Sequence, residues 1–226
     1  RKENQNFIKL CFNSDLASEI TLQPIKRFGF DGAVIFSDIL MLPYGIGQRV
    51  EFEKNYGPKL GDIEIEKINK IDEINFTENL SKVYEAISNT SKNPIMTNRD
   101  MIGFVGAPWT ILVYMINKSS PKKGLSSEFY KDDLLTNKLL EIIEKFLKLH
   151  IKNQVDAGAK VIQIFDSWAG LLEDKIPEYI YEPTLKIVEY VKQLGVPVIC
   201  FPRGIRDYTK FCEIVKPDAV NIDYDV

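Results

Sequence analysis

The sequence has 226 residues, of which 45% are hydrophobic and 27% charged, and its formal net charge is -3. A chain of this length can bury the core of one globular domain, and its slight acidic excess argues against a nucleic-acid-binding surface, which needs clustered basic residues. The cysteines Cys11, Cys200 and Cys212 are widely spaced, so neither a disulfide framework nor a zinc cluster is indicated, and a reducing cytoplasm fits. No apolar stretch approaches the length of a membrane span.

Helix and strand signals alternate from the first residues onward. Asn13 or Ser14 can cap a helix that runs to about Phe28, and Gly29 can end it. A strand over residues 32–36 follows. The next part is less regular, and its patterns predict a loop around Pro43, Gly45 and Gly47, a hairpin-like pair over 49–53 and 62–65, and a helix over 77–90.

The C-terminal half repeats a strand-then-helix pattern. Its predicted strands are 101–106, 160–165, 196–201 and 218–223, and its predicted helices are 109–117, 133–157, 178–194 and 205–216. With the strand at 32–36, this makes five strand units at βα spacing. Right-handed crossovers of this kind build a parallel sheet with helices outside, so the fold class is α/β.

One carboxylate stands at the end of the first of these strands. Asp38 follows the apolar run Ala33-Val34-Ile35-Phe36. A buried strand reads as continuous apolar residues, and its carboxyl end is where a β/α fold gathers its reactive groups. Asp38 is therefore the first candidate site residue, although an aspartate that closes the strand as an N-cap or Asx-turn fits the same pattern.

Five segments, in order, resemble the uroporphyrinogen decarboxylase family. Three of them are FSDIL (36–40), GFVGAPWTILVYM (103–115) and QIFDSWAG (163–170), and the other two are EITLQPIKRFGFD (19–31) and PVICFPRG (197–204). The resemblance implies a β/α (TIM) barrel, of which about five of the eight strand units are present. It also implies that 1–226 is a single catalytic domain, incomplete at both ends, because the family's MRQAGR and GHG segments are absent.

The resemblance implies the loss of the four acetate carboxyl groups of uroporphyrinogen III without any cofactor or metal. Protonation of the pyrrole makes the ring its own electron sink. The enzyme must then stabilise a cationic intermediate, which an ionised carboxylate does. Asp38 matches the family's central aspartate, and its oxygens can also accept the inward-pointing pyrrole N–H groups.

Three further residues match substrate-binding positions of the family. Tyr114 can hydrogen-bond a substrate carboxylate or help position Asp38, or it can be a core aromatic residue. Ser167 can hold a peripheral carboxylate, or it can cap a turn. Phe104 can form an apolar wall of the macrocycle pocket or belong to the core. Asp166 is expected to be a structural hydrogen-bond acceptor.

Other charged and titratable residues have weaker support. Arg49 and Arg203 can add positive charge for a polycarboxylate substrate or can be solvated surface residues. His150 stands in the middle of a predicted helix, which favours a surface or core residue over a general base. The Gly45-Ile46-Gly47 segment lacks the third glycine and the following helix of a dinucleotide site.

Two other functions are compatible with the same sequence. A zinc-dependent corrinoid or thiol methyltransferase has the same fold, but its His and Cys ligands are not evident in this sequence. A non-catalytic tetrapyrrole-binding relative is the second alternative. The family also implies a homodimer for the complete protein, and neither a nucleic acid nor a membrane is an expected partner.

Overall fold

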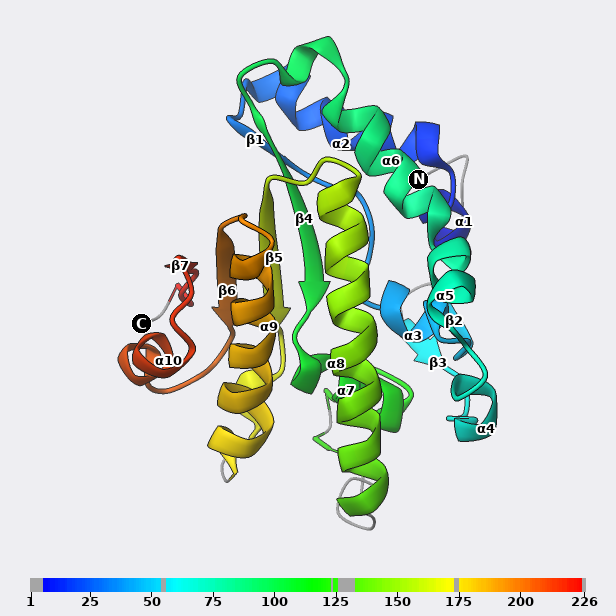
Figure 1. Ribbon diagram of the computed structural model, residues 1–226, viewed down its shortest axis with the longest axis vertical. Coiled ribbons are helices and arrows are strands. Elements are labelled where there is room, and N and C mark those ends of the chain that lie inside the picture. Colours follow the sequence, from blue (N-terminus) through cyan, green and yellow to red (C-terminus); the bar gives the residue numbers. More distant parts are fainter. Residues whose placement is uncertain (1–5, 54–55, 123, 126–132, 173–174, 225–226) are drawn as a thin grey trace.

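The computed structural model describes residues 6–53, 56–122, 124–125, 133–172 and 175–224. Its centre is a five-stranded sheet in the order β1-β4-β5-β6-β7, in which every neighbouring pair is parallel (Figure 1). The strands are β1 (Gly32–Val34), β4 (Asp100–Gly106), β5 (Val161–Asp166), β6 (Val198–Pro202) and β7 (Ala219–Val220). The prediction of five parallel strand units is confirmed.

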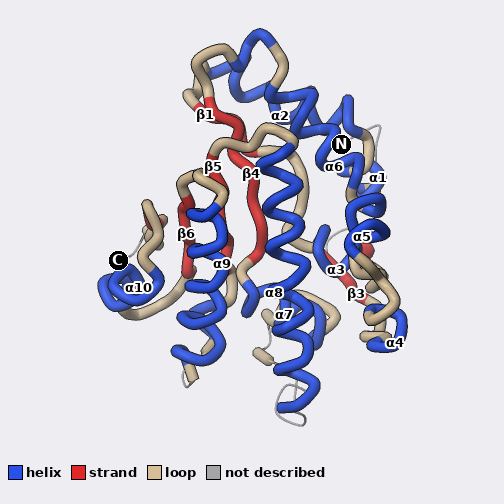
Figure 2. Tube along the Cα trace, viewed as in Figure 1, coloured by secondary structure: helices blue, strands red, loops and turns tan. Residues whose placement is uncertain are grey.

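Helices pack along the sheet and carry the chain from each strand to the next. Figure 1 shows α8 and α9 side by side in front of the sheet, and Figure 2 shows the same alternation of helix and strand. The helices that contact the sheet include α2 (Ser14–Phe28), α6 (Ser81–Ser91), α7 (Pro108–Asn117), α8 (Asp133–Asp156) and α9 (Glu182–Gln193), and α10 (Tyr208–Val215) packs on α9.

The boundaries of α2 follow its sequence signals. The Asn13 side chain accepts a hydrogen bond from the backbone N–H of Leu16, so Asn13 and not Ser14 is the N-cap. Gly29 ends the helix in the left-handed conformation with φ of 69°, which glycine adopts without steric cost.

The segment between β1 and β4 is more helical than its sequence pattern suggests. The predicted loop after Asp38 contains the short helix α3 (Met41–Gly45), and the predicted helix 77–90 is two helices, α5 (Glu73–Asn79) and α6, separated at Leu80. A hairpin is present as β2 (Val50–Glu53) and β3 (Gly57–Leu60), but the predicted second strand over 62–65 is wrong, because the chain pairs earlier and Ile65 begins a helix. The remaining short elements are α1 (Phe7–Cys11), α4 (Ile65–Ile68) and the 3₁₀ turn η1 (Pro94–Met96).

The predicted C-terminal elements exist, but two are shorter. The last strand is confined to Ala219–Val220, and α10 begins at Tyr208 rather than 205 because Asp207 caps it through the Lys210 N–H. The predicted helix 178–194 starts as a π-helical turn, η4 (Pro177–Tyr181), before α9. The chain also forms α7 (Pro108–Asn117) after β4 and the 3₁₀ turn η3 (Ala169–Leu171) after β5.

The two faces of the sheet differ in burial. In β4 the buried Met101, Gly103 and Val105 alternate with the half-buried Ile102 and Phe104. The same alternation runs through β6, where Ile199 and Phe201 are the half-buried residues. Successive side chains of a strand point to opposite faces, so the helices cover one face fully and the other face is less covered.

Gln154 joins α8 to β4 through two hydrogen bonds. The Gln154 amide accepts from the Phe104 N–H and donates to the Phe104 carbonyl oxygen, both at 3.0 Å. A Cβ at Gly103 would lie 2.5 Å from Gln154 Oε1. The absence of a side chain at Gly103 therefore makes room for this contact.

His150 lies inside the protein on α8. Its Nδ1 atom is 3.0 Å from the Tyr84 hydroxyl, and burial lowers the pKa of His150 to about 3. His150 is therefore a neutral, hydrogen-bonded core residue, as one of the two readings of the sequence proposed.

Across the described residues, no helix is both long and apolar enough to cross a membrane.

Candidate active site

Asp38 stands in the turn that follows β1. The backbone N–H of Leu40 donates to Asp38 Oδ1 at 2.8 Å, so the side chain does form the local turn contact that a non-catalytic aspartate would form. Burial nevertheless raises the pKa of Asp38 to about 6, against the opposing effect of the Leu40 N–H. The carboxylate is thus poorly solvated and is stabilised in its charged form by a single backbone donor.

The charge of Asp38 contributes to the raised pKa of two other side chains, Cys11 and Tyr114. Burial, with a smaller contribution from the charge of Asp38, raises the pKa of Cys11 on α1 to about 12. The Cys11 thiol therefore stays protonated at neutral pH and is not a nucleophile. Burial also raises the pKa of Tyr114, with Asp38 as a smaller contributor in the same direction. Tyr114 and Asp38 thus belong to one electrostatic neighbourhood.

Tyr114 reaches this neighbourhood from α7. Pro108 at the first turn of α7 and Lys118 in the left-handed conformation at its end set the limits of the helix. The half-buried ring of Tyr114 meets the ring of Trp168 edge to face, with centroids 6.0 Å apart. Ser120 and Trp168 beside the hydroxyl lower the pKa of Tyr114, against the larger effect of burial.

Asp166 and Ser167 occupy the end of β5 and take different surroundings. Asp166 is buried on the helix-covered side, where the Thr110 hydroxyl donates to its Oδ1 atom at 2.7 Å. Burial raises the pKa of Asp166 to about 7, and Thr110 and the Trp168 N–H act in the opposite direction. Ser167 is half-buried at the carboxyl edge of the sheet. The expectation of a structural acceptor at Asp166 agrees with this geometry.

Phe104 lies on the less covered face of β4. Its ring meets that of Phe165 edge to face, with centroids 5.6 Å apart. The two rings form an apolar surface one to two residues before the strand ends that lead to Tyr114 and Ser167. This position suits a wall beneath a bound ring system, and Phe104 also packs against a buried apolar cluster that includes Ala33, Ile35 and Met101.

The two arginines considered from sequence lie in exposed surroundings. Arg49 forms an exposed ion pair with Glu51, and Arg203 Nε is 3.9 Å from Asp223 Oδ1 with most of the arginine side chain exposed. Arg49 therefore fits the reading of a solvated surface charge. Within the described ranges, no three His, Cys, Asp or Glu side chains are grouped closely enough to hold a metal ion.

Loops after β5 and β6 meet at two glycines. The Gly170 N–H donates to the Arg203 carbonyl oxygen at 3.0 Å, and a Cβ at Gly170 would lie 2.5 Å from the Gly204 carbonyl oxygen. Two of the segments that resemble the family, QIFDSWAG and PVICFPRG, thus touch through their backbones.

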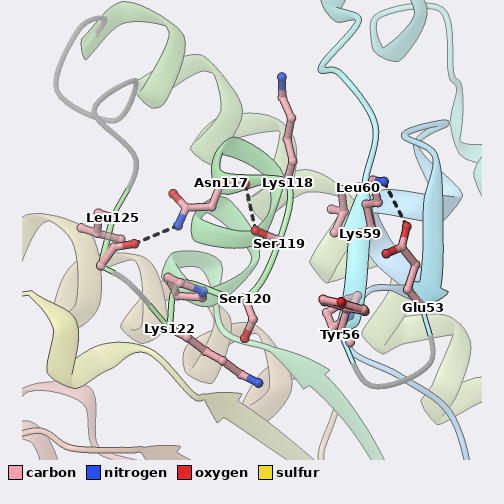
Figure 3. Close-up of a pocket in the computed structure, with 14 residues that line it drawn as sticks. Glu53, Tyr56, Lys59, Leu60, Asn117, Lys118, Ser119, Ser120, Lys122 and Leu125 are labelled. Carbon is pink, nitrogen blue, oxygen red and sulfur yellow. Dashed lines mark hydrogen bonds and ion pairs between the residues drawn. The ribbon is translucent and has the colours of Figure 1, made fainter.

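A pocket of about 770 Å³ lies between the β2–β3 hairpin and the loop that follows α7 (Figure 3). Its lining includes Lys59, whose ion pair with Glu53 is drawn as a dashed line, and Lys118, whose ammonium pairs with Asp62. Ser120 lines the pocket and also neighbours the Tyr114 hydroxyl. Ser120 therefore connects the pocket to Tyr114.

Comparison with known proteins agrees with the resemblance of the five segments. The family model described as uroporphyrinogen decarboxylase matches residues 1–226. The chain belongs to the uroporphyrinogen decarboxylase family. The uroporphyrinogen decarboxylase of Rickettsia bellii (strain RML369-C) is 42% identical over 99% of this chain and 67% of its own length. That of Rickettsia felis (strain ATCC VR-1525 / URRWXCal2) is 38% identical over 99% of this chain and 66% of its own length.

A solved structure supports the fold of this family member. A methyltransferase from Methanosarcina mazei superposes with a TM-score of 0.69 over 93% of this chain and 70% of its own. At 16% sequence identity, this similarity concerns the fold alone. The chain spans about two thirds of the length of the curated uroporphyrinogen decarboxylases that it matches.

Asp38 lies four residues beyond β1, Tyr114 lies on α7, the helix that follows β4, and Ser167 directly follows β5, so the three residues come from segments after three neighbouring strands. Sequence reasoning missed Thr110 and Trp168, which connect α7 to the end of β5. A signal for Thr110 was present, because residues four apart on a helix share a face and Thr110 precedes Tyr114 by four.

Proposed function

We propose that the protein decarboxylates the four acetate side chains of uroporphyrinogen III to give coproporphyrinogen III, with Asp38 as its catalytic residue and without a cofactor. The observation that carries this proposal is the identity to curated uroporphyrinogen decarboxylases over 99% of the chain. The half-buried carboxylate at the end of β1 supplies the group that this chemistry needs.

The proposed reaction passes through a cation. A proton adds to a pyrrole ring carbon, the bond between the methylene and the carboxylate breaks, and its electron pair flows into the ring as CO₂ leaves. The methylene then takes up a proton to become a methyl group, and the ring returns its own proton. Asp38 stabilises the positive ring because it is ionised above a pKa of about 6 and is partly removed from water.

The other site residues receive binding roles in this proposal. Tyr114 and Ser167 present hydroxyl groups that can donate to peripheral carboxylates of the substrate. Phe104 and its neighbour Phe165 give an apolar surface for the macrocycle. The position of the three polar residues at adjoining strand ends supports this arrangement, since parallel sheets bind ligands at that edge.

We also propose that the five-stranded sheet is part of a β/α barrel. The fold of the methyltransferase neighbour and membership of the family support this, together with the less covered face of the sheet, which would line the barrel interior. A homodimer is proposed on the family resemblance. A cytoplasmic location is proposed because the three cysteines form no disulfide. Sedimentation velocity on the complete protein measures the oligomeric state.

Turnover by the complete protein tests the function. Anaerobic incubation with uroporphyrinogen III, followed by oxidation and chromatography of the porphyrins, is expected to give a four-carboxyl product. The activity should survive dialysis against a strong chelator. Activity that is lost on chelation and restored by zinc would favour the methyltransferase-like alternative, and tetrapyrrole binding without turnover would favour a non-catalytic relative.

A further inference from the structure

We propose that Thr110 is a positioning residue, which holds the turn after β5 so that Ser167 and Tyr114 face the same substrate. This inference rests on the proposed function and adds a residue with no direct contact to the substrate. Thr110 is fully buried on α7. Its hydroxyl joins three parts of the site.

The hydroxyl of Thr110 uses both of its hydrogen-bonding capacities. It donates to Asp166 Oδ1 at 2.7 Å and accepts from the backbone N–H of Trp168 at 3.1 Å. Ser167 lies between these two partners in the chain. One side chain therefore fixes the residue before Ser167 and the residue after it.

A second residue of α7 forms a hydrogen bond to the same turn. The indole N–H of Trp109 donates to the carbonyl oxygen of Trp168 at 2.9 Å. The Trp168 peptide groups are thus held on both sides by neighbouring residues of one helix. The turn after β5 cannot shift without breaking bonds to α7.

The same helix carries Tyr114 to the site. Thr110 and Tyr114 are four residues apart and share a helix face, and the Tyr114 ring lies against the Trp168 ring. The Thr110 hydroxyl therefore couples the strand end that presents Ser167 to the helix that presents Tyr114. The pair of proposed carboxylate-binding groups is positioned as one unit.

A set of variants of the complete protein tests this role. Thr110→Val keeps the shape of the side chain and removes both hydrogen bonds. Because misplaced binding groups weaken substrate affinity, KM for uroporphyrinogen is expected to rise about tenfold with little change in kcat. Thr110→Ser restores the hydroxyl and should return KM to within about twofold of the wild-type value.

Thr90 offers a matched control on α6. It is also fully buried, and its hydroxyl donates to Ala86 O at 2.7 Å and contacts Ser18 Oγ at 3.0 Å, away from the site. Thr90→Val should lower the unfolding temperature to a similar degree as Thr110→Val and leave KM unchanged. This comparison separates a loss of stability from a loss of positioning.

The outcomes distinguish the two proposals. An inactive wild-type protein contradicts the proposed function itself. An active wild-type protein with an unchanged KM in Thr110→Val, or with a serine variant that is no better than the valine variant, overturns the positioning role. If Thr110→Val does not fold, Thr110→Cys, which keeps a weak donor, takes its place and is expected to raise KM at least about threefold.

Discussion

Two strand ends in this protein have an aspartate beside a serine in opposite order, with Ser37-Asp38 in the turn after β1 and Asp166-Ser167 where β5 ends. Both carboxyl groups have a raised pKa because of burial. The charge of Asp38 makes a small contribution to the raised pKa of Tyr114 at the candidate site, whereas Asp166 is buried against α7 and accepts a hydrogen bond from Thr110. A raised pKa alone therefore does not identify a catalytic carboxylate, and the hydrogen bond from Thr110 distinguishes the surroundings of Asp166 from those of Asp38.

The largest contrast is expected when each aspartate becomes an amide. Asp38→Asn keeps the shape of the side chain and removes the charge that a cationic intermediate needs, so kcat should fall by about 10²- to 10³-fold. Asp166→Asn should retain activity within about threefold, since the amide oxygen still accepts from Thr110. Steady-state kinetics with circular dichroism measures both. Equal losses in the two variants would remove the distinction between the two strand ends.

Asp166→Asn, the substitution with the smaller expected effect on activity, is expected to change the stability of the protein. Asp166 has a folded-state pKa of about 7, well above its ordinary value, so the folded protein gains stability as pH falls through 7 and holds a costly buried charge above it. At pH 8, Asp166→Asn is expected to be more stable than the wild type by roughly 1–3 kcal/mol. The advantage should shrink by pH 5. Urea unfolding at the two pH values measures it.

The pH dependence of turnover sharpens the role of Asp38. The ionised carboxylate is the active form, so kcat/KM should fall about tenfold per pH unit below the pKa of about 6. The residual activity of Asp38→Asn should lack this acidic limb. A profile from pH 5 to 8 in both proteins is the measurement. A limb of unchanged position in the asparagine variant would assign it to another group.

The smallest expected effect concerns His150, a buried base whose pKa is lowered by burial, whereas burial raises the pKa of the two aspartates. His150 is neutral in the folded protein with a pKa of about 3, so the unfolded chain takes up a proton first as pH falls below about 6.5 and stability is lost. Between pH 7.5 and 5.5 this loss should be about 1 kcal/mol greater in the wild type than in His150→Gln. The contributions of both aspartates are common to the two proteins and cancel. Parallel slopes would show that His150 does not titrate differently on unfolding.

The sequence predicted the order of strands and the candidate residues better than their surroundings. Mostly apolar runs identified β1, β4, β5 and β6, as in strands that helices cover, but they did not predict the exposed Val34 of β1. The split of the predicted helix at Leu80 was not visible, because both halves share an apolar pattern. The contact of Thr110 with Asp166 joins residues 56 positions apart, and periodicity carries no information on such pairs.

The glycine contact between the loops after β5 and β6 has a consequence for motion. Gly170 and Gly204 touch through their backbones, with no side chain between them that could change rotamer to absorb a displacement. The hydrogen bond from Gly170 to Arg203 joins the same two loops. A shift of the loop that carries Ser167 is therefore expected to displace the loop that carries Arg203, so that the two loops move together on the timescale of loop motion.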